Sequence, residues 1–148
     1  KNPRQQIVMI DLDYFRDFNE KLGHQSGDQV LRKFGEIIKK VINKDGLYGR
    51  YGGEEFIAAI PHDYPDLDKR LEQLKGEYTD FVKTTFNTSE LRLASTLSMG
   101  VFDADLSQPE MTLNLAIQNA DDALYKSKET RNTITYWTKG LAHNPKKK

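Results

Sequence analysis

The sequence contains no cysteine, only five prolines and a single tryptophan in 148 residues. Without cysteine the chain forms neither a disulfide nor a thiolate metal site, so a bound metal would need oxygen ligands or one of three histidines. Oxygen ligands suit hard divalent cations. The missing residue type therefore favours a cation such as Mg²⁺ at any metal site.

The chain also lacks an excess of charge of either sign, since 22 lysines and arginines balance 22 aspartates and glutamates. No whole-molecule field would steer it to nucleic acid or an anionic membrane, and we expect no nucleic-acid partner. No apolar run approaches the ~20 residues of a membrane span, and the first residues lack the hydrophobic region of a signal peptide. We expect a cytoplasmic domain, whose parent protein could still be anchored in a membrane.

The length is that of one ordinary domain, so we expect a single domain over residues 1–148 with a disordered tail at 141–148. Apolar periodicity predicts strands at 7–10, 47–51, 55–60, 91–101 and 134–137. It predicts helices at 13–22, 30–42, 67–86 and 109–124, the last opened by Pro109. The strand at 91–101 alternates, so we expect only one of its faces to be buried. The order β-α-α-β-β-α-β-α-β indicates an α+β fold, with helices flanking a mixed sheet.

A glycine pair, Gly52 and Gly53, separates two strand-like runs and predicts a tight hairpin turn. Glu54 and Glu55 follow the turn directly and point to opposite faces of the emerging strand. If the hairpin lies beside the first strand, Asp11 and one glutamate converge at adjacent strand ends. Gathered carboxylates repel one another, and a divalent cation relieves that repulsion. We favour a Mg²⁺ site over the alternative of two solvated glutamates at a loop tip.

Two aspartates follow the first strand. For Asp13, capping of the next helix is favoured over metal binding. Asp11 lies at the end of a buried strand, where an unpaired carboxylate is costly unless a cation or a donor meets it. The turn into the helix exposes backbone N–H groups near Phe15 and Arg16, which suit phosphate oxygens. Arg16 adds a positive charge there, or is simply a surface residue.

The connection between the first two helices holds an amide, an imidazole and an acid. Asn19 and Asp28 can supply the donors and acceptors that read a purine edge. Equally, His24 packs over the helix end while Asp28 or Ser26 caps the long helix.

Further along, Lys126 and Lys128 lie near a helix C-terminus with Arg131 just beyond. The helix dipole alone favours cations there.

Five ordered segments resemble the motifs of the GGDEF family of diguanylate cyclases, and together they cover nearly the whole chain. The family patterns are DxDxFKxxND, GHxxGD, GGEEF, TxSxGV and ADxALYxAK. Here they read DLDYFRDFNE (11–20), GHQSGD (23–28), RYGGEEF (50–56), TLSMGV (96–101) and ADDALYKSK (120–128).

The resemblance implies condensation of two GTP molecules into cyclic di-GMP with release of pyrophosphate. It also implies a palm-like sheet shared in outline with nucleotide cyclases and polymerases. Each domain would bind one GTP, so the active unit would be a homodimer of two half-sites. The cofactor would be Mg²⁺, with Mn²⁺ as a substitute. Two alternatives remain: a non-catalytic module that binds GTP or docks on a partner, and a palm that makes other nucleotide products.

The resemblance also assigns roles residue by residue. The metal ligands would be Asp11, the main chain of Leu12 and Glu54; we add Glu55, beside Glu54 in the turn, as a further candidate ligand. Glu54 would in addition accept the proton of the 3′-hydroxyl, and Arg16 would supply the transition-state cation.

The other implied residues bind the substrate. Guanine and ribose contacts fall to Asn19, His24 and Asp28, and the presence of Asp28 favours guanine. The remaining substrate contacts are assigned to Phe15, Gly52, Gly53, Lys128 and Arg131.

Several positions depart from the family pattern. Arg16 replaces the usual lysine, which keeps the charge but alters its geometry. The family's GRN appears as Glu129-Thr130-Arg131-Asn132 without the glycine, while Lys128 stays in register. The product-inhibition motif RxxD falls at 43–46, which reads NKDG, so we expect that inhibitory site to be absent. The segment that usually precedes the first strand is missing, so we expect a piece of a longer protein with an upstream sensory or receiver domain.

Overall fold

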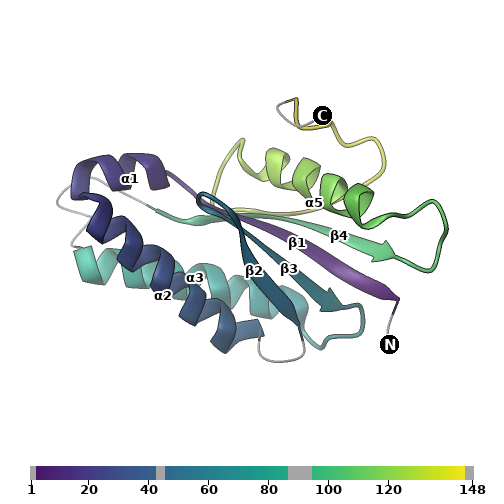
Figure 1. Cartoon of the computed structure of the whole chain (residues 1–148), viewed down its shortest axis with the longest axis horizontal. Helices are drawn as coiled ribbons and strands as arrows, with labels where there is room; N and C mark the ends of the chain where they lie inside the picture. The colour runs from purple at the N-terminus through teal and green to yellow at the C-terminus, as the bar shows by residue number, and fades with distance from the viewer. Residues whose placement is uncertain (1–2, 43–45, 87–94, 146–148) are drawn as a thin grey trace.

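The structure, a computed structural model, describes residues 3–42, 46–86 and 95–145. Figure 1 shows its elements, which follow the predicted order β-α-α-β-β-α-β-α-β. The strands are β1 (Arg4–Leu12), β2 (Leu47–Gly52), β3 (Glu55–Pro61), β4 (Leu97–Asp105) and β5 (Ile134–Tyr136). The helices are α1 (Phe15–Leu22), α2 (His24–Ile42), α3 (Leu67–Phe86) and α5 (Leu113–Ser127).

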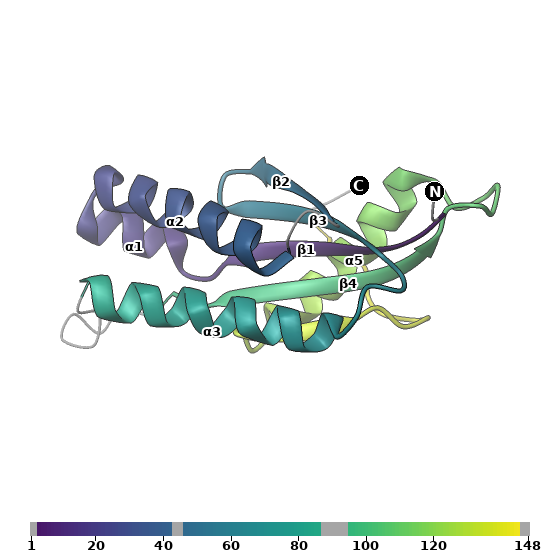
Figure 2. The same cartoon turned by 90° about the horizontal axis from the view of Figure 1, so that it is seen from below.

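The strands form one mixed sheet in the order β2-β3-β1-β4-β5. The pairs β2–β3, β3–β1 and β1–β4 are antiparallel, and β5 runs parallel to β4. Figures 1 and 2 show α2 and α3 side by side along one face of the sheet and α5 on the other. The α+β prediction of a mixed sheet flanked by helices is therefore confirmed.

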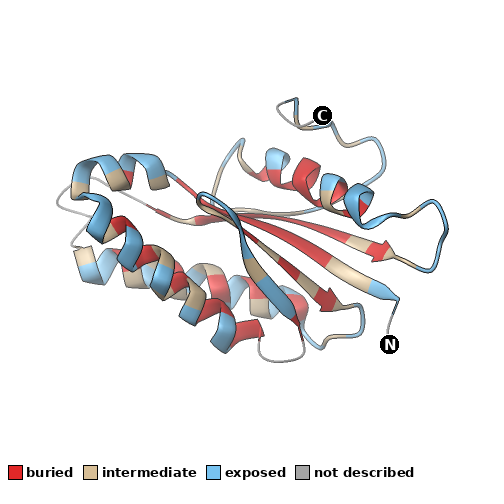
Figure 3. Ribbon diagram, viewed as in Figure 1, coloured by how far each residue is buried: buried red, intermediate tan, exposed pale blue. Residues whose placement is uncertain are grey.

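Both faces of the central strand β1 are buried, as the run at 7–10 predicts. Val8 and Ile10 face the larger core beneath α2 and α3. Ile7 and Met9 face a smaller cluster beneath α5. Figure 3 shows the resulting band of buried residues through the middle of the sheet. Only the first residues of β1 are exposed or half-buried, and Asp11 and Leu12 at its other end are buried.

The expectation of one exposed face for the strand at 91–101 is wrong for the part that is described. All of the first six residues of β4 are buried, because helices cover both faces of the sheet. At Gly100 the packing of α5 is so close that a Cβ would lie 2.1 Å from the Leu124 nitrogen and 2.2 Å from the Ala120 oxygen. Residues 91–94 of the predicted strand lie outside the described residues.

Two helix starts also differ from prediction. Helix α5 begins at Leu113 rather than at Pro109, because the Thr112 hydroxyl accepts a hydrogen bond from the Leu115 amide (3.1 Å) and caps the helix there. Helix α2 begins at His24, so neither Ser26 nor Asp28 caps it.

The chain turns directly from α1 into α2 at Gly23, which has a φ of +92°.

The C-terminal segment runs back along α5 as far as residue 145, and residues 146–148 of the expected tail lie outside the described residues. His143 Nδ1 lies 2.6 Å from a carboxylate oxygen of Asp122, and the Asn144 amide donates to the other oxygen at 2.8 Å. None of the described helices has the length and apolar character needed to cross a membrane.

Candidate functional site

The ends of β1 and β3 bring acidic residues together. Asp11 pairs in register with Glu55, and the Leu12 amide donates to the Glu54 carbonyl at 3.2 Å. Directly opposed residues of an antiparallel pair point to the same side of a sheet. By strand alternation that side is the one covered by α5, which Met9 also faces. The hairpin thus lies beside the first strand, and Asp11 lies beside the Gly-Gly-Glu-Glu turn.

The turn itself leaves open space next to its backbone. Gly53 has a φ of +51°, and the Arg50 side chain donates to the Gly53 carbonyl at 2.8 Å, which closes the hairpin. Apart from the adjacent residues of the turn, no described atom lies within 4 Å of the position that a Cβ would take at Gly52 or Gly53. A ligand group could therefore approach the main chain at either glycine.

Asp11 is a buried carboxylate whose charge is only partly compensated. Its side chain is 12% exposed, and its Oδ1 atom has no hydrogen-bond partner in the described part of the chain. The Lys128 ammonium is 3.5 Å from that atom. Burial raises the pKa of Asp11 to about 7; Lys128 opposes the rise, while Glu54, Glu55 and Asp13 add to it. The ionised form of Asp11 is thus held at a cost that a cation would relieve.

These residues fit a divalent cation that takes only some of its ligands from the protein. Across residues 3–42, 46–86 and 95–145, no three acidic or histidine side chains form a ready-made metal cluster. Mg²⁺ rarely needs one, because it keeps several waters and binds through one or two carboxylates plus substrate phosphates. Asp11, with Glu54 and Glu55 at the adjacent turn, provides that kind of partial ligand set. The Leu12 main chain is the next group along β1.

The prediction that Asp13 caps the first helix is wrong. Tyr14 takes the cap position in a left-handed conformation, with φ +59°, and no side chain caps α1. The Asp13 side chain is fully buried on the α5 side, where Thr96, Ser98 and Lys128 donate to its oxygens at 2.6, 2.7 and 2.7 Å. The Asn132 main-chain amide also donates to it at 3.1 Å, so four donors hold this carboxylate in place.

The start of α1 lies next to the segment that follows α5, which contains Arg131. The Arg131 guanidinium lies over the Tyr14 ring, 4.7 Å from its centroid, and its buried Nε has no hydrogen-bond partner among the described residues. Arg16 is exposed on the first turn of α1, and Phe15 beside it is half-buried. Lys126 points elsewhere, since it pairs with Glu129 at 3.0 Å.

A second group of predicted residues meets where α1 joins α2. The Asn19 amide nitrogen lies 2.9 Å from His24 Nδ1. A Cβ at Gly27 would fall 2.1 Å from the Asn19 oxygen and 3.3 Å from the Phe15 ring, so a larger residue there would displace the Asn19 side chain. Asp28 is exposed on the next turn. Phe15, Asn19 and His24 therefore form one cluster with Gly27.

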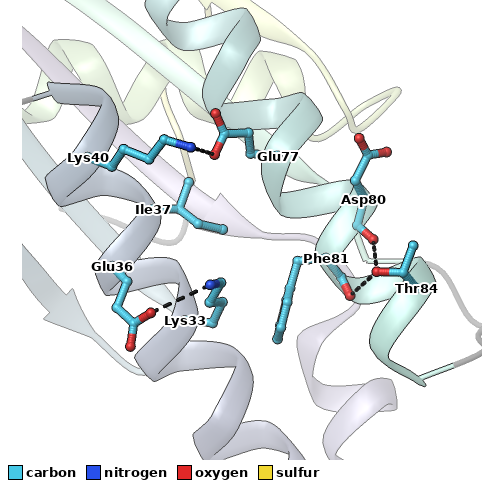
Figure 4. Close-up of a pocket in the computed structure, with 8 residues that line it drawn as sticks. All are labelled: Lys33, Glu36, Ile37, Lys40, Glu77, Asp80, Phe81 and Thr84. Carbon is cyan, nitrogen blue, oxygen red and sulfur yellow. Dashed lines mark hydrogen bonds and ion pairs between the residues drawn. The ribbon is translucent and has the colours of Figure 1, made fainter.

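A groove between α2 and α3, of about 370 Å³, lies on the opposite face of the sheet (Figure 4). Four of its charged residues form ion pairs: Lys40 with Glu77 at 3.1 Å, and Lys33 with Glu36 at 3.6 Å. A hydrogen bond from Gln73, aided by Lys40, holds the pKa of Glu77 below its ordinary value. None of the predicted site residues lines this groove, and we do not assign it to the site.

The sequence profile of the family described as diguanylate cyclase, GGDEF domain, matches residues 1–133. The chain belongs to the GGDEF family. Similar curated proteins include the probable diguanylate cyclase DgcF of Escherichia coli strain K12, 33% identical over 125 residues, which are 83% of this chain and 39% of that protein. Diguanylate cyclase A of Treponema denticola is 28% identical over 130 residues, 87% of this chain and 34% of that protein. The chain thus spans little more than a third of the length of these GGDEF relatives.

Solved GGDEF structures share the fold. The GGDEF domain of DgcB from Caulobacter crescentus, in complex with c-di-GMP, matches with a TM-score of 0.76 and 31% identity over 90% of this chain and 77% of that one. The active GGEEF domain of a diguanylate cyclase from Vibrio cholerae matches with a TM-score of 0.77 and 25% identity, over 93% and 85% of the two chains. The palm-like fold implied by the motifs is therefore confirmed.

Proposed function

We propose that this GGDEF domain is a diguanylate cyclase, which condenses two GTP molecules into cyclic di-GMP and releases two pyrophosphates. The observation that carries the proposal is the buried and only partly compensated carboxylate of Asp11 beside an intact Gly-Gly-Glu-Glu turn. Such a carboxylate is costly in a domain that only has to fold, and it suits a domain that binds a metal-bound triphosphate. The names of the curated relatives support the same reaction.

In the proposed reaction the 3′-hydroxyl oxygen of one GTP attacks the α-phosphorus of the other, and the bond to the leaving pyrophosphate breaks. Glu54 takes the hydroxyl proton, because it lies in the turn beside Asp11 and its side chain is only partly buried. Arg16, exposed at the start of α1, meets the charge that develops on the phosphoryl oxygens. Mg²⁺, held by Asp11, Leu12, Glu54 and Glu55, would neutralise phosphate charge when bound; Mn²⁺ would substitute.

The remaining residues of the proposal position the nucleotide. Asn19, His24 and Asp28 around the α1–α2 junction would contact guanine and ribose, with Phe15 packed beside them. The open backbone at Gly52 and Gly53 leaves room for the phosphates.

Lys128 and Arg131 lie near the β1–α1 turn, where free N–H groups favour anions. We propose that these two side chains contact the triphosphate.

One domain would hold one GTP, so two domains must face one another. We propose that the active unit is a homodimer, brought together in the parent protein by an upstream sensory or receiver domain. The reaction would take place in the cytoplasm, where GTP is available. At low protein concentration, the initial rate should then rise with the square of the domain concentration.

The deciding experiment incubates the domain with GTP and Mg²⁺ and separates the products by chromatography. We expect cyclic di-GMP with the wild type, and none after chelation of the metal or in Asp11→Asn. Absence of product at protein concentrations where scattering shows dimers would overturn the proposal. GTP binding without turnover in those dimers would favour the non-catalytic module.

A further inference from the structure

Asp13 connects three parts of the chain that are far apart in sequence. Its main chain is tied to the segment before β4, since its amide donates to the Thr96 carbonyl at 2.8 Å and its carbonyl accepts from the Ser95 hydroxyl at 2.8 Å. Ser95 is held in turn by the Tyr78 hydroxyl of α3 at 2.7 Å. Asp13 is therefore a fixed point in the fold, and its fully buried side chain touches no solvent.

The side chain of Asp13 reaches from this fixed point to the segment that follows α5. Lys128 Nζ lies 2.7 Å from one oxygen, and the Asn132 amide donates to the other at 3.1 Å. At the end of this segment, Arg131 has a φ of +61° and Asn132 a φ of +50°. Consecutive left-handed residues other than glycine persist only where their surroundings hold them. Contacts at both ends of the 128–132 segment come from the same carboxylate.

Lys128 is placed so that it can serve a ligand as well. Its Nζ is 2.7 Å from Asp13 Oδ1 but 3.5 Å from Asp11 Oδ1, and its side chain is 25% exposed. An ammonium group has three N–H donors. Asp13 uses one, and the distance to Asp11 is too long for a good hydrogen bond. At least one donor of Lys128 is therefore left for an anion at the Asp11 site.

We propose that Asp13 is a positioning residue, which holds Lys128 and the 128–132 segment against the Asp11 site so that the ammonium meets the triphosphate of the nucleotide. The proposal rests on the proposed function. Asp13 itself touches no substrate, because it is fully buried. It acts through Lys128, and its effect should be confined to the phosphate end of the ligand.

The test measures two dissociation constants in the presence of Mg²⁺, one for guanosine and one for a GTP analogue whose α–β bridge cannot be cleaved. The dissociation constant for guanosine divided by that for the analogue reports what the triphosphate adds to binding. In Asp13→Asn we expect the ratio to fall about tenfold, the loss of one charge-assisted contact, with guanosine affinity unchanged. Lys128→Met should give the same fall, and the double variant should be no worse than either single one.

Asp103→Asn is the matched control. It removes a carboxylate from an ion pair with Arg4 (2.7 Å) at the opposite end of the sheet, and the ratio should stay at its wild-type value. Thr96→Val provides a second probe of Asp13, because it deletes one hydrogen bond to the carboxylate without removing charge. We expect a smaller fall in the ratio, about threefold. This variant carries the test if Asp13→Asn does not fold.

The possible results separate the two proposals. An unchanged ratio in Asp13→Asn, or in Thr96→Val where Asp13→Asn does not fold, overturns the positioning role. An equal loss of guanosine and analogue affinity also overturns it, since a purely structural residue would act on both. Failure of the wild type to bind either ligand overturns the proposed function, and the positioning role with it.

Discussion

Gly27 and Asn19 are in such close contact that a methyl group at Gly27 would lie 2.1 Å from the Asn19 side-chain oxygen. Gly27 belongs to α2 and Asn19 to α1, so the missing side chain at one position allows the other to lie against the helix junction. Asn19 in turn contacts His24 at 2.9 Å. A glycine inside a helix normally weakens it. Here it makes room for a side chain that we expect to read the nucleotide base.

Gly27→Ala should therefore reduce guanosine affinity by more than it reduces stability. Alanine favours the helix by about 1 kcal/mol, but the contact with Asn19 forces the amide away and costs about 1–3 kcal/mol. We expect guanosine binding to weaken about tenfold or more in titration calorimetry, with near wild-type unfolding in denaturant.

Gly35→Ala is the matched control for this variant. Gly35 is in the same helix, and no described atom outside its own turn lies within 4 Å of a Cβ there. This change should stabilise the domain by about 0.5–1 kcal/mol and leave binding alone. Equal guanosine affinity in both variants would contradict the role assigned to Asn19.

Gly100→Ala should strongly destabilise the domain. The added Cβ would meet main-chain atoms of Leu124, Ala120 and Ala123 at 2.1, 2.2 and 2.8 Å, and main chain cannot turn aside as a flexible side chain can. Helix α5 would have to move away from β4, at a cost of about 3 kcal/mol or more. Denaturant unfolding measures the loss; a variant as stable as the wild type would show that α5 is not held this closely against β4.

The order of elements could be predicted because periodicity is local. Each helix and strand shows its own pattern of apolar residues, and the glycine pair marks the hairpin that brings Glu55 beside Asp11. The coverage of both sheet faces could not be read from β4 alone. It depends on the packing of α5 against Gly100, and the local pattern of apolar residues in one strand does not show which helix packs on it.

The buried environment of Asp13 could not be predicted for a related reason. Its position before a helix favours a cap, but Ser98 and Lys128, which determine its environment, are 85 and 115 residues away. Thr96 and Ser98 alternate, so their hydroxyls point to one face of the strand. These two hydroxyls on one face of the strand are the feature of the sequence that could have predicted a buried acidic partner.

The contribution of Asp11 to the stability of the metal-free domain should fall as pH rises from about 4 to 7. The pKa of Asp11 is raised from 3.8 to about 7, so the folded state keeps a proton that the unfolded chain gives up in this range. Folding is therefore favoured at low pH by this group, and that contribution is lost as pH passes through the folded pKa.

Asp11→Asn isolates the effect of Asp11 from that of other titrating groups. The difference in unfolding free energy between wild type and variant should change over this pH range and become constant above it, with the variant gaining in relative stability. Added Mg²⁺ should stabilise the wild type at pH 8 and not the variant. A difference that is the same at pH 5 and pH 8 would contradict the assigned burial of Asp11.

Glu54→Gln should abolish cyclic di-GMP formation while leaving the fold intact. Glutamine keeps the size of the side chain but accepts no proton, and loss of a general base typically costs 10²–10⁴-fold in rate, so we expect at least about 10²-fold here. Chromatographic product assays measure this rate.

The matched control is Glu77→Gln in the groove between α2 and α3, where the lost ion pair with Lys40 is exposed and remote from the site. That variant should turn over at the wild-type rate. Wild-type turnover in Glu54→Gln would show instead that the 3′-hydroxyl proton goes to another acceptor, of which Glu55 is the nearest in sequence.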